Sequence, residues 1–128
     1  MLIEDHYSTR VALTNLLVRR GFEVVSAGSA SEAREVALDD DFGVVISDFN
    51  LPDGDGCALF KELRASRPEL SGIALSGYGA YEDFERSIEA GFARHLTKPV
   101  DMTALESLLA ALFAERSAAG AELQAKSR

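Results

Sequence analysis

Short apolar runs alternate with longer amphipathic stretches along nearly the whole chain. The apolar runs are at residues 2–3, 24–25, 44–46, 73–75 and 92–97. Four of them are too short to form helices, and Val and Ile dominate two of them, so the pattern predicts buried β-strands. The stretches between the runs have the spacing of amphipathic helices.

Five helices are predicted from this spacing and from residues typical of helix ends. They cover residues 8–20, 29 up to the acidic run at 39–41, 55–66, 82–90, and a last segment from 101 onward. Gly21 favours termination of the first helix. Ser29 and Glu32 form a capping-box pattern, and Asp101 is a good N-cap residue. Five strands alternating with five helices predict an α/β fold with a doubly wound parallel sheet.

Length and charge narrow the function classes. A chain of 128 residues favours one domain; we assign it to residues 1–114 and treat 115–128 as a helical extension, a linker or a tail. The net charge of −8 argues against binding the phosphate backbone of nucleic acids. The longest apolar run, 108–114, is too short to cross a membrane. We expect a cytoplasmic protein without nucleic-acid or membrane contacts.

Charged and hydroxyl side chains follow four of the five predicted strands. Glu4 and Asp5 follow the first strand, Asp48 the third, Ser76 the fourth and Lys98 the fifth. Right-handed crossovers place the carboxyl ends of parallel strands along one edge of the sheet, where open α/β folds bind ligands. We therefore expect these five residues, although distant in sequence, to form one site.

Three neighbouring carboxylates need a counter-charge. Two like charges about 4 Å apart repel by roughly 4 kcal/mol at an effective dielectric constant of about 20, and Lys98 offsets only part of this repulsion. Oxygen ligands with room for water suit Mg²⁺. Such an ion would also guide a phosphoryl group to a carboxylate nucleophile. The chemistry inferred from the residues is phosphoryl transfer to an aspartate.

Four segments of the sequence together resemble the receiver domains of two-component response regulators. They are IEDH (3–6), VISDFNLPDGDG (45–56), LSGY (75–78) and LTKPV (96–100). Each segment is weak alone, but all four occur in the family's order. The resemblance implies a flavodoxin-like sheet of strand order 2-1-3-4-5. The SGYG and HLTKPVD phrases are most similar to receivers of hybrid sensor histidine kinases.

The resemblance also implies a role for each site residue. Asp48 would accept a phosphoryl group from a histidine kinase or a histidine phosphotransfer protein. Asp5, Asp48 and the backbone carbonyl of Asn50 would bind Mg²⁺, with Glu4 acting through water. Ser76 and Lys98 would contact the phosphoryl group. Asn50 and Tyr78 would tune the lifetime of the phosphorylated state. The resemblance also implies a cis peptide bond at Pro99.

Two positions depart from the family pattern or bear on its metal site. His95 occupies the position of the switch residue on the fifth strand, where Tyr or Phe is more usual. His6 follows the acidic pair, and we expect it to begin the first helix rather than to bind the metal.

Two other functions remain open at this stage. A Mg²⁺-dependent phosphohydrolase of the haloacid dehalogenase type would need a second aspartate at position 50, where this chain has Asn50. A pseudo-receiver that binds partners without phosphorylation is disfavoured by the complete set of acidic residues and Lys98. We expect a signalling domain rather than an enzyme, and whether it forms a homodimer is left open.

Overall fold

A five-stranded parallel sheet forms the centre of the computed structural model, which describes residues 1–77 and 81–126. The strand order is β2-β1-β3-β6-β7, which corresponds to the predicted order 2-1-3-4-5 and confirms the flavodoxin-like arrangement. A short antiparallel hairpin, β4–β5, follows β3 and accounts for the two extra strand labels. The strands of the main sheet are β1 (Leu2–Ile3), β2 (Ser26–Ala27), β3 (Val44–Asp48), β6 (Ser71–Ser76) and β7 (Arg94–Thr97).

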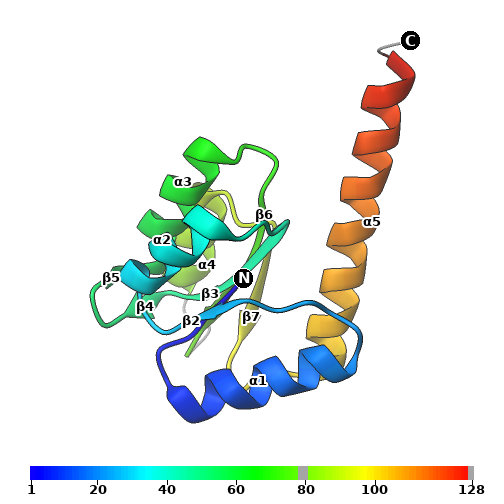
Figure 1. Ribbon diagram of the computed structural model, residues 1–128. Coiled ribbons are helices and arrows are strands. Elements are labelled where there is room, and N and C mark those ends of the chain that lie inside the picture. Colours follow the sequence, from blue (N-terminus) through cyan, green and yellow to red (C-terminus); the bar gives the residue numbers. More distant parts are fainter. Residues whose placement is uncertain (78–80, 127–128) are drawn as a thin grey trace.

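Helices cover both faces of this sheet, with α1 and α5 on one side and α2, α3 and α4 on the other (Figure 1). The helices are α1 (Tyr7–Arg19), α2 (Ala30–Asp39), α3 (Gly56–Ser66), α4 (Tyr81–Ala90) and α5 (Met102–Lys126), and the hairpin strands are β4 (Asn50–Leu51) and β5 (Gly54–Asp55). Within the described residues, no helix is long and apolar enough to cross a membrane.

Two hydrophobic cores result from the alternation of side chains along the strands. On β3, Val45 packs with the core under α2 and α3, whereas Ile46 packs with the core under α1 and α5. On β6, Ala74 packs with the core under α2 and α3, and Leu75 packs with the core under α1 and α5. Strands buried on both faces explain why the apolar runs of the sequence are continuous.

The second strand lies two residues later than predicted. The apolar run at 24–25 contributes side chains to both cores, but the strand is formed by Ser26 and Ala27, which pair with Leu2 and Ile3. Gly21 ends α1 with a φ of 92°, as its position predicted. The run at 24–25 therefore marks partly buried side chains that pack against the two cores, and pairing with β1 determines where the strand lies.

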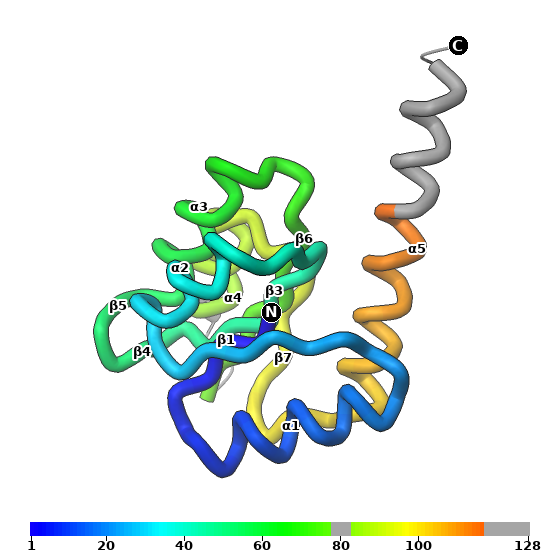
Figure 2. The backbone as a smooth tube through the Cα atoms, viewed as in Figure 1, coloured from blue at the N-terminus to red at the C-terminus, as the bar shows by residue number. Residues whose placement is uncertain are grey.

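The first strand is short but is hydrogen-bonded on both sides, to β2 and to β3. It lies beside β3 near the N-terminus (Figure 2). The amide of Glu4 donates to the carbonyl of Ala27 (3.0 Å), and the amide of Ile46 donates to the carbonyl of Met1 (2.8 Å). These bonds hold the Glu4–Asp5 pair at the carboxyl edge of the sheet, beside the end of β3.

Candidate functional site

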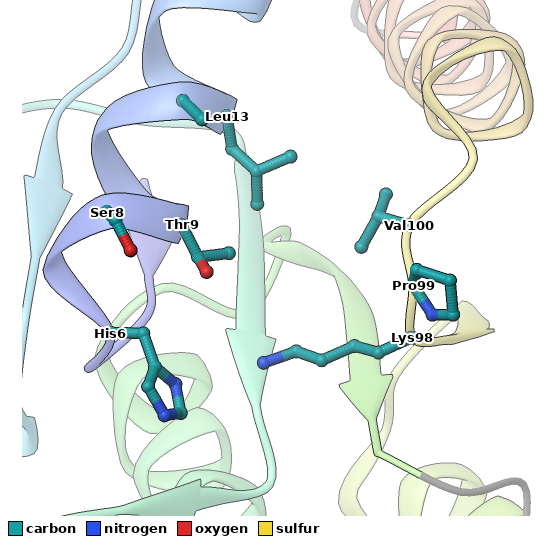
Figure 3. A pocket seen from close by; sticks show the side chains of 8 residues that line it. His6, Ser8, Thr9, Leu13, Lys98, Pro99 and Val100 are labelled. Carbon is teal, nitrogen blue, oxygen red and sulfur yellow. The ribbon is translucent and has the colours of Figure 1, made fainter.

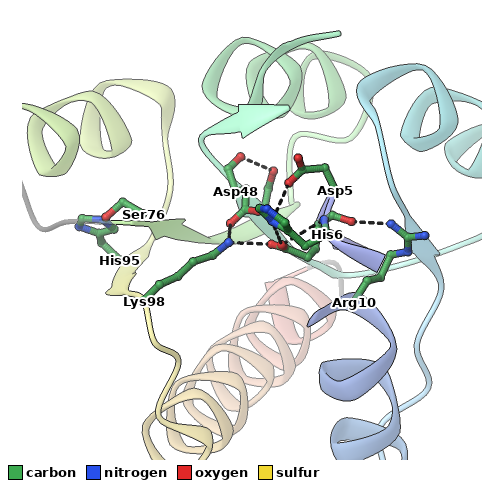
Figure 4. A network of polar contacts seen from close by, with 9 residues as sticks. Asp5, His6, Arg10, Asp48, Ser76, His95 and Lys98 are labelled. Atoms are coloured by element: carbon green, nitrogen blue, oxygen red, sulfur yellow. Dashed lines mark hydrogen bonds and ion pairs between the residues drawn. The ribbon is translucent and has the colours of Figure 1, made fainter. Parts of the chain in front are cut away.

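The carboxyl edge of the sheet brings together the residues that the sequence placed at strand ends (Figure 4). A cavity of about 290 Å³ lies at this edge. It is lined by Asp5 after β1, Asp48 at the end of β3, Ser76 at the end of β6 and Lys98 after β7. Glu4 contacts the same Lys98 from beneath the surface. The predicted convergence of these side chains is what the structure shows.

Lys98 joins the two buried carboxylates. Its Nζ lies 2.7 Å from Oδ1 of Asp48 and 2.9 Å from Oε2 of Glu4. Glu4 is fully buried and Asp48 is 5% exposed, so water does little to stabilise either charge. An ammonium group shared between two carboxylates leaves one negative charge uncompensated.

The pKa values of the cluster reflect this imbalance. Burial, followed by the neighbouring Glu4 carboxyl, raises the pKa of Asp48 to about 8. Burial also disfavours ionised Glu4, but hydrogen bonds with Asp48 and Lys98 hold the pKa of Glu4 below its usual value. The same two carboxylates raise the pKa of Lys98 despite its burial. The fold alone therefore does not keep both carboxylates charged, and an added cation would.

The donor set of the cavity fits a hard divalent cation. Asp5, Asp48 and Asn50 all line the cavity, and one ligand atom from each of Glu4, Asp5, His6 and Asp48 lies within 4.8 Å of the others. Asn50 is the exposed first residue of β4, two positions after Asp48 at the buried end of β3. Carboxylate and carbonyl oxygens with space for water are the ligands that Mg²⁺ prefers.

His6 and Arg10 surround the acidic pair from α1. Nδ1 of His6 lies 3.1 Å from Oε1 of Glu4 and 3.4 Å from Oδ1 of Asp5. Arg10 donates to the backbone carbonyl of Glu4 (2.7 Å). Sequence reasoning missed Arg10, because nothing in the sequence distinguishes it from any other polar residue of an amphipathic helix. His6 is the N-cap residue of α1, as expected, but its ring faces the carboxylates.

Ser76 is hydrogen-bonded to the residue predicted to act as its switch partner. Its Oγ lies 2.8 Å from Nε2 of His95. The His95 ring is half-buried, with its centroid 5.6 Å from the ring of Phe49 and 5.8 Å from that of Phe84. Burial lowers the pKa of His95, although Asp83 offsets part of this effect.

A second cavity, of about 560 Å³, lies on the other side of Lys98, between α1 and the segment that follows β7 (Figure 3). Its lining includes Leu13 and Val100, and the peptide bond between Lys98 and Pro99 is cis. His6 and Lys98 line both cavities. Tyr78, expected to tune the phosphorylated lifetime, lies outside the described residues.

Comparisons with known proteins agree with this geometry. The family model described as the response regulator receiver domain matches residues 1–110. The response regulator protein FleR of Pseudomonas aeruginosa is 36% identical over 110 residues, covering 86% of this chain and 23% of FleR. The sensor histidine kinase RcsC of Salmonella typhi is 29% identical over 116 residues, covering 91% of this chain and 12% of RcsC.

A solved structure shows the same fold. The CheY-like response regulator receiver domain protein from Methanospirillum hungatei JF-1 aligns with a TM-score of 0.82 and 26% identity, covering 91% of this chain and 93% of that one. The chain thus matches nearly all of an isolated receiver structure but at most about a quarter of the two longer relatives.

Proposed function

Because the chain belongs to the response regulator receiver family, we propose that Asp48 is the residue that accepts its phosphoryl group. The observation that carries this assignment is the position of the Asp48 carboxylate. It is nearly buried at the end of β3, lines the 290 Å³ cavity and lies 2.7 Å from Lys98 Nζ. Asp5 and Ser76 line the same cavity. The Asp48 carboxylate is therefore accompanied there by a second carboxylate that could bind a metal and by a hydroxyl group.

The proposed reaction transfers a phosphoryl group from a phosphohistidine to Asp48. A carboxylate oxygen of Asp48 forms a bond to phosphorus while the bond from phosphorus to the donor's imidazole nitrogen breaks. Asp5, Asp48 and the Asn50 carbonyl, with Glu4 acting through water, would hold Mg²⁺, which would supply charge neutralisation. Lys98 then pairs with one phosphoryl oxygen. Ser76 donates a hydrogen bond to another.

We propose that the donor is a histidine kinase or a histidine phosphotransfer protein, and that the output is a changed protein-binding surface. Residues 1–114 would form this signalling unit, which carries out its own phosphorylation and dephosphorylation but has no other substrate. Relatives include both a response regulator and a sensor histidine kinase, and a hybrid kinase is the parent we favour from the sequence. Such a domain would act in the cytoplasm.

Phosphorylation by a small-molecule donor tests the assignment. Incubation with acetyl phosphate and Mg²⁺ should label the chain, and Asp48→Asn should abolish the label. Asp53→Asn is the matched control, because Asp53 is a nearby loop aspartate that accepts hydrogen bonds from the amides of Ala30 and Ser31. Intact-mass measurement detects the phosphoryl group. Labelling of Asp48→Asn, or steady turnover of unrelated phosphate esters, would contradict the proposal.

A further inference from the structure

We propose that His95 is a positioning residue that directs the Ser76 hydroxyl, and that protonation of its ring releases this hydroxyl to the phosphoryl group. Acid and phosphorylation then favour the same state of the domain. The inference rests on the proposed function, because it takes Ser76 to contact the phosphoryl group on Asp48. It adds a proton dependence that a Phe or Tyr at position 95 could not supply, since neither ring titrates near neutral pH.

The hydrogen bond between Ser76 and His95 carries the argument. The Oγ of Ser76 lies 2.8 Å from Nε2 of His95. Ser76 is 3% exposed, so its hydroxyl proton needs an acceptor. Within residues 1–77 and 81–126, Nε2 is the only hydrogen-bond partner of this hydroxyl. The neutral ring therefore accepts the proton of Ser76 at Nε2 and carries its own proton on Nδ1.

Protonation of the ring reverses the direction of this bond. An imidazolium has an N–H at both nitrogens and no acceptor, so Nε2 then donates to the Oγ of Ser76. The hydroxyl proton must turn away from the ring. Ser76 and Asp48 line the same cavity of about 290 Å³, where an oxygen of the phosphoryl group would accept that proton. Only the neutral ring therefore competes with the phosphoryl group, and the two side chains stay bonded in both cases.

The surroundings of the ring set when it takes up a proton. Burial lowers the pKa of His95, and Asp83 on α4 offsets part of this effect. The ring is therefore neutral near pH 7 and becomes charged below its ordinary pKa of about 6.5. A phosphoryl group brings negative charge to the cavity, which favours the charged ring. The cations of the neighbouring elements are paired with carboxylates: Arg86 with Asp83 and Asp55, Arg94 with Glu115, and Lys98 with Glu4 and Asp48.

The affinity for beryllium fluoride in the presence of Mg²⁺ tests the proposal, measured by NMR titration at about pH 7.5 and about pH 5.5. His95→Phe is measured at both values, because it records every pH effect that does not involve the ring. The affinity of the wild type divided by that of His95→Phe should rise by up to roughly fivefold as the pH falls, the value of one competing hydrogen bond. Because linkage is reciprocal, beryllium fluoride should in turn raise the pKa of His95.

Two variants of Ser76 separate release of the hydroxyl from simple attraction between a charged ring and the phosphoryl group. In Ser76→Ala, the further change His95→Phe should shift the affinity equally at both pH values, because no hydroxyl is left to release. Ser76→Thr keeps a hydroxyl and should keep the pH dependence of the wild type. The ¹⁵N shifts of the neutral His95 ring should place its proton on Nδ1.

Three results would overturn the proposal. They are an affinity ratio that does not change with pH, a pH dependence that persists in Ser76→Ala, and a neutral His95 ring that carries its proton on Nε2. Failure of the wild type to bind beryllium fluoride with Mg²⁺ at either pH would instead overturn the proposed function, so the two failures are distinguishable.

Discussion

The hydroxyl of Ser76 and the ring of His95 are joined by a hydrogen bond of 2.8 Å between Oγ and Nε2. The bond connects the end of β6 with β7 and engages the same hydroxyl that is proposed to contact the phosphoryl group. A Phe at position 95 would pack between Phe49 and Phe84 but could not form this bond. With the role proposed for Ser76, this interaction of the unphosphorylated state would compete with phosphoryl binding.

Removing this bond should favour binding of a phosphoryl mimic. His95→Phe keeps an aromatic ring and frees the Ser76 hydroxyl. Since the net value of a hydrogen bond is about 1 kcal/mol, affinity for beryllium fluoride in the presence of Mg²⁺ should rise by roughly fivefold. Ser76→Ala, which removes the hydroxyl itself, should lower it. NMR titration gives both affinities, and equal or weaker binding by His95→Phe would show that the bond does not compete.

The same histidine should make stability depend on pH. Burial lowers the pKa of His95 in the folded chain, whereas the unfolded chain protonates it near the ordinary value of about 6.5. As pH falls through that value, the unfolded state takes up a proton that the folded state resists, so the free energy of unfolding decreases. Urea unfolding at about pH 7.5 and about pH 5.5 should show a larger loss for wild type than for His95→Phe. Equal losses of unfolding free energy in the two proteins would show that His95 is not the source of the pH dependence.

Loss of Lys98 should destabilise the fold when Mg²⁺ is absent. Lys98→Met leaves the buried carboxylates of Glu4 and Asp48 without their shared partner, which costs about 3 kcal/mol for a broken buried pair. Adding Asp48→Asn to this variant should restore part of the stability at alkaline pH, because burial raises the pKa of Asp48 to about 8 and its carboxylate becomes a second buried charge only as the pH rises above that pKa. Lys61→Met, at an exposed position of α3, is the control. Urea unfolding measures all four proteins, and equal stability of the two lysine variants would refute the account.

The helix boundaries and the gathering of the site residues could be predicted because local chemistry or topology determines them. The Ser29 side chain accepts a hydrogen bond from the amide of Glu32, and the Asp101 side chain accepts one from the amide of Thr103. The residues predicted to begin α2 and α5 therefore do cap these helices. The end of β3 at Asp48 follows from the change from apolar to polar residue types after Ile46. Parallel topology then brings Asp48 and Lys98 to the same edge.

Contacts that depend on register or on rotamers could not be predicted. The position of β2 is set by pairing with β1, so the apolar run at 24–25 missed it by two residues. The bond between Lys98 and Glu4 joins residues 94 positions apart, and its geometry depends on how two long side chains fill one buried space. The direction of the exposed His6 ring is likewise a rotamer choice that no pattern in the sequence encodes.

Gly56, the first residue of α3, should be required for the position of Asp48, whereas Gly54 in the preceding strand β5 should not. A Cβ at Gly56 would overlap the backbone carbonyl oxygen of Asp48 and would lie 3.1 Å from Oγ of Ser47. Pairing with β6 holds the β3 backbone in place. The Asp48 carbonyl therefore cannot move away from the added Cβ without a large cost in free energy. Gly56→Ala should therefore lower the free energy of unfolding by about 1–3 kcal/mol.

Gly54→Ala is the matched control. A Cβ at Gly54 would make an ordinary contact of 3.8 Å with Cβ of Ala30, and reduced freedom of the unfolded chain should leave stability unchanged or raise it by about 0.4–1 kcal/mol. Because the overlap at Gly56 involves the proposed phosphoacceptor, Asp48, Gly56→Ala should also weaken binding of Mg²⁺ and beryllium fluoride, whereas Gly54→Ala should not. Urea unfolding and NMR titration separate the two effects. If Gly56→Ala matched Gly54→Ala in both measurements, the close approach of α3 to Asp48 would have no role in shaping the site.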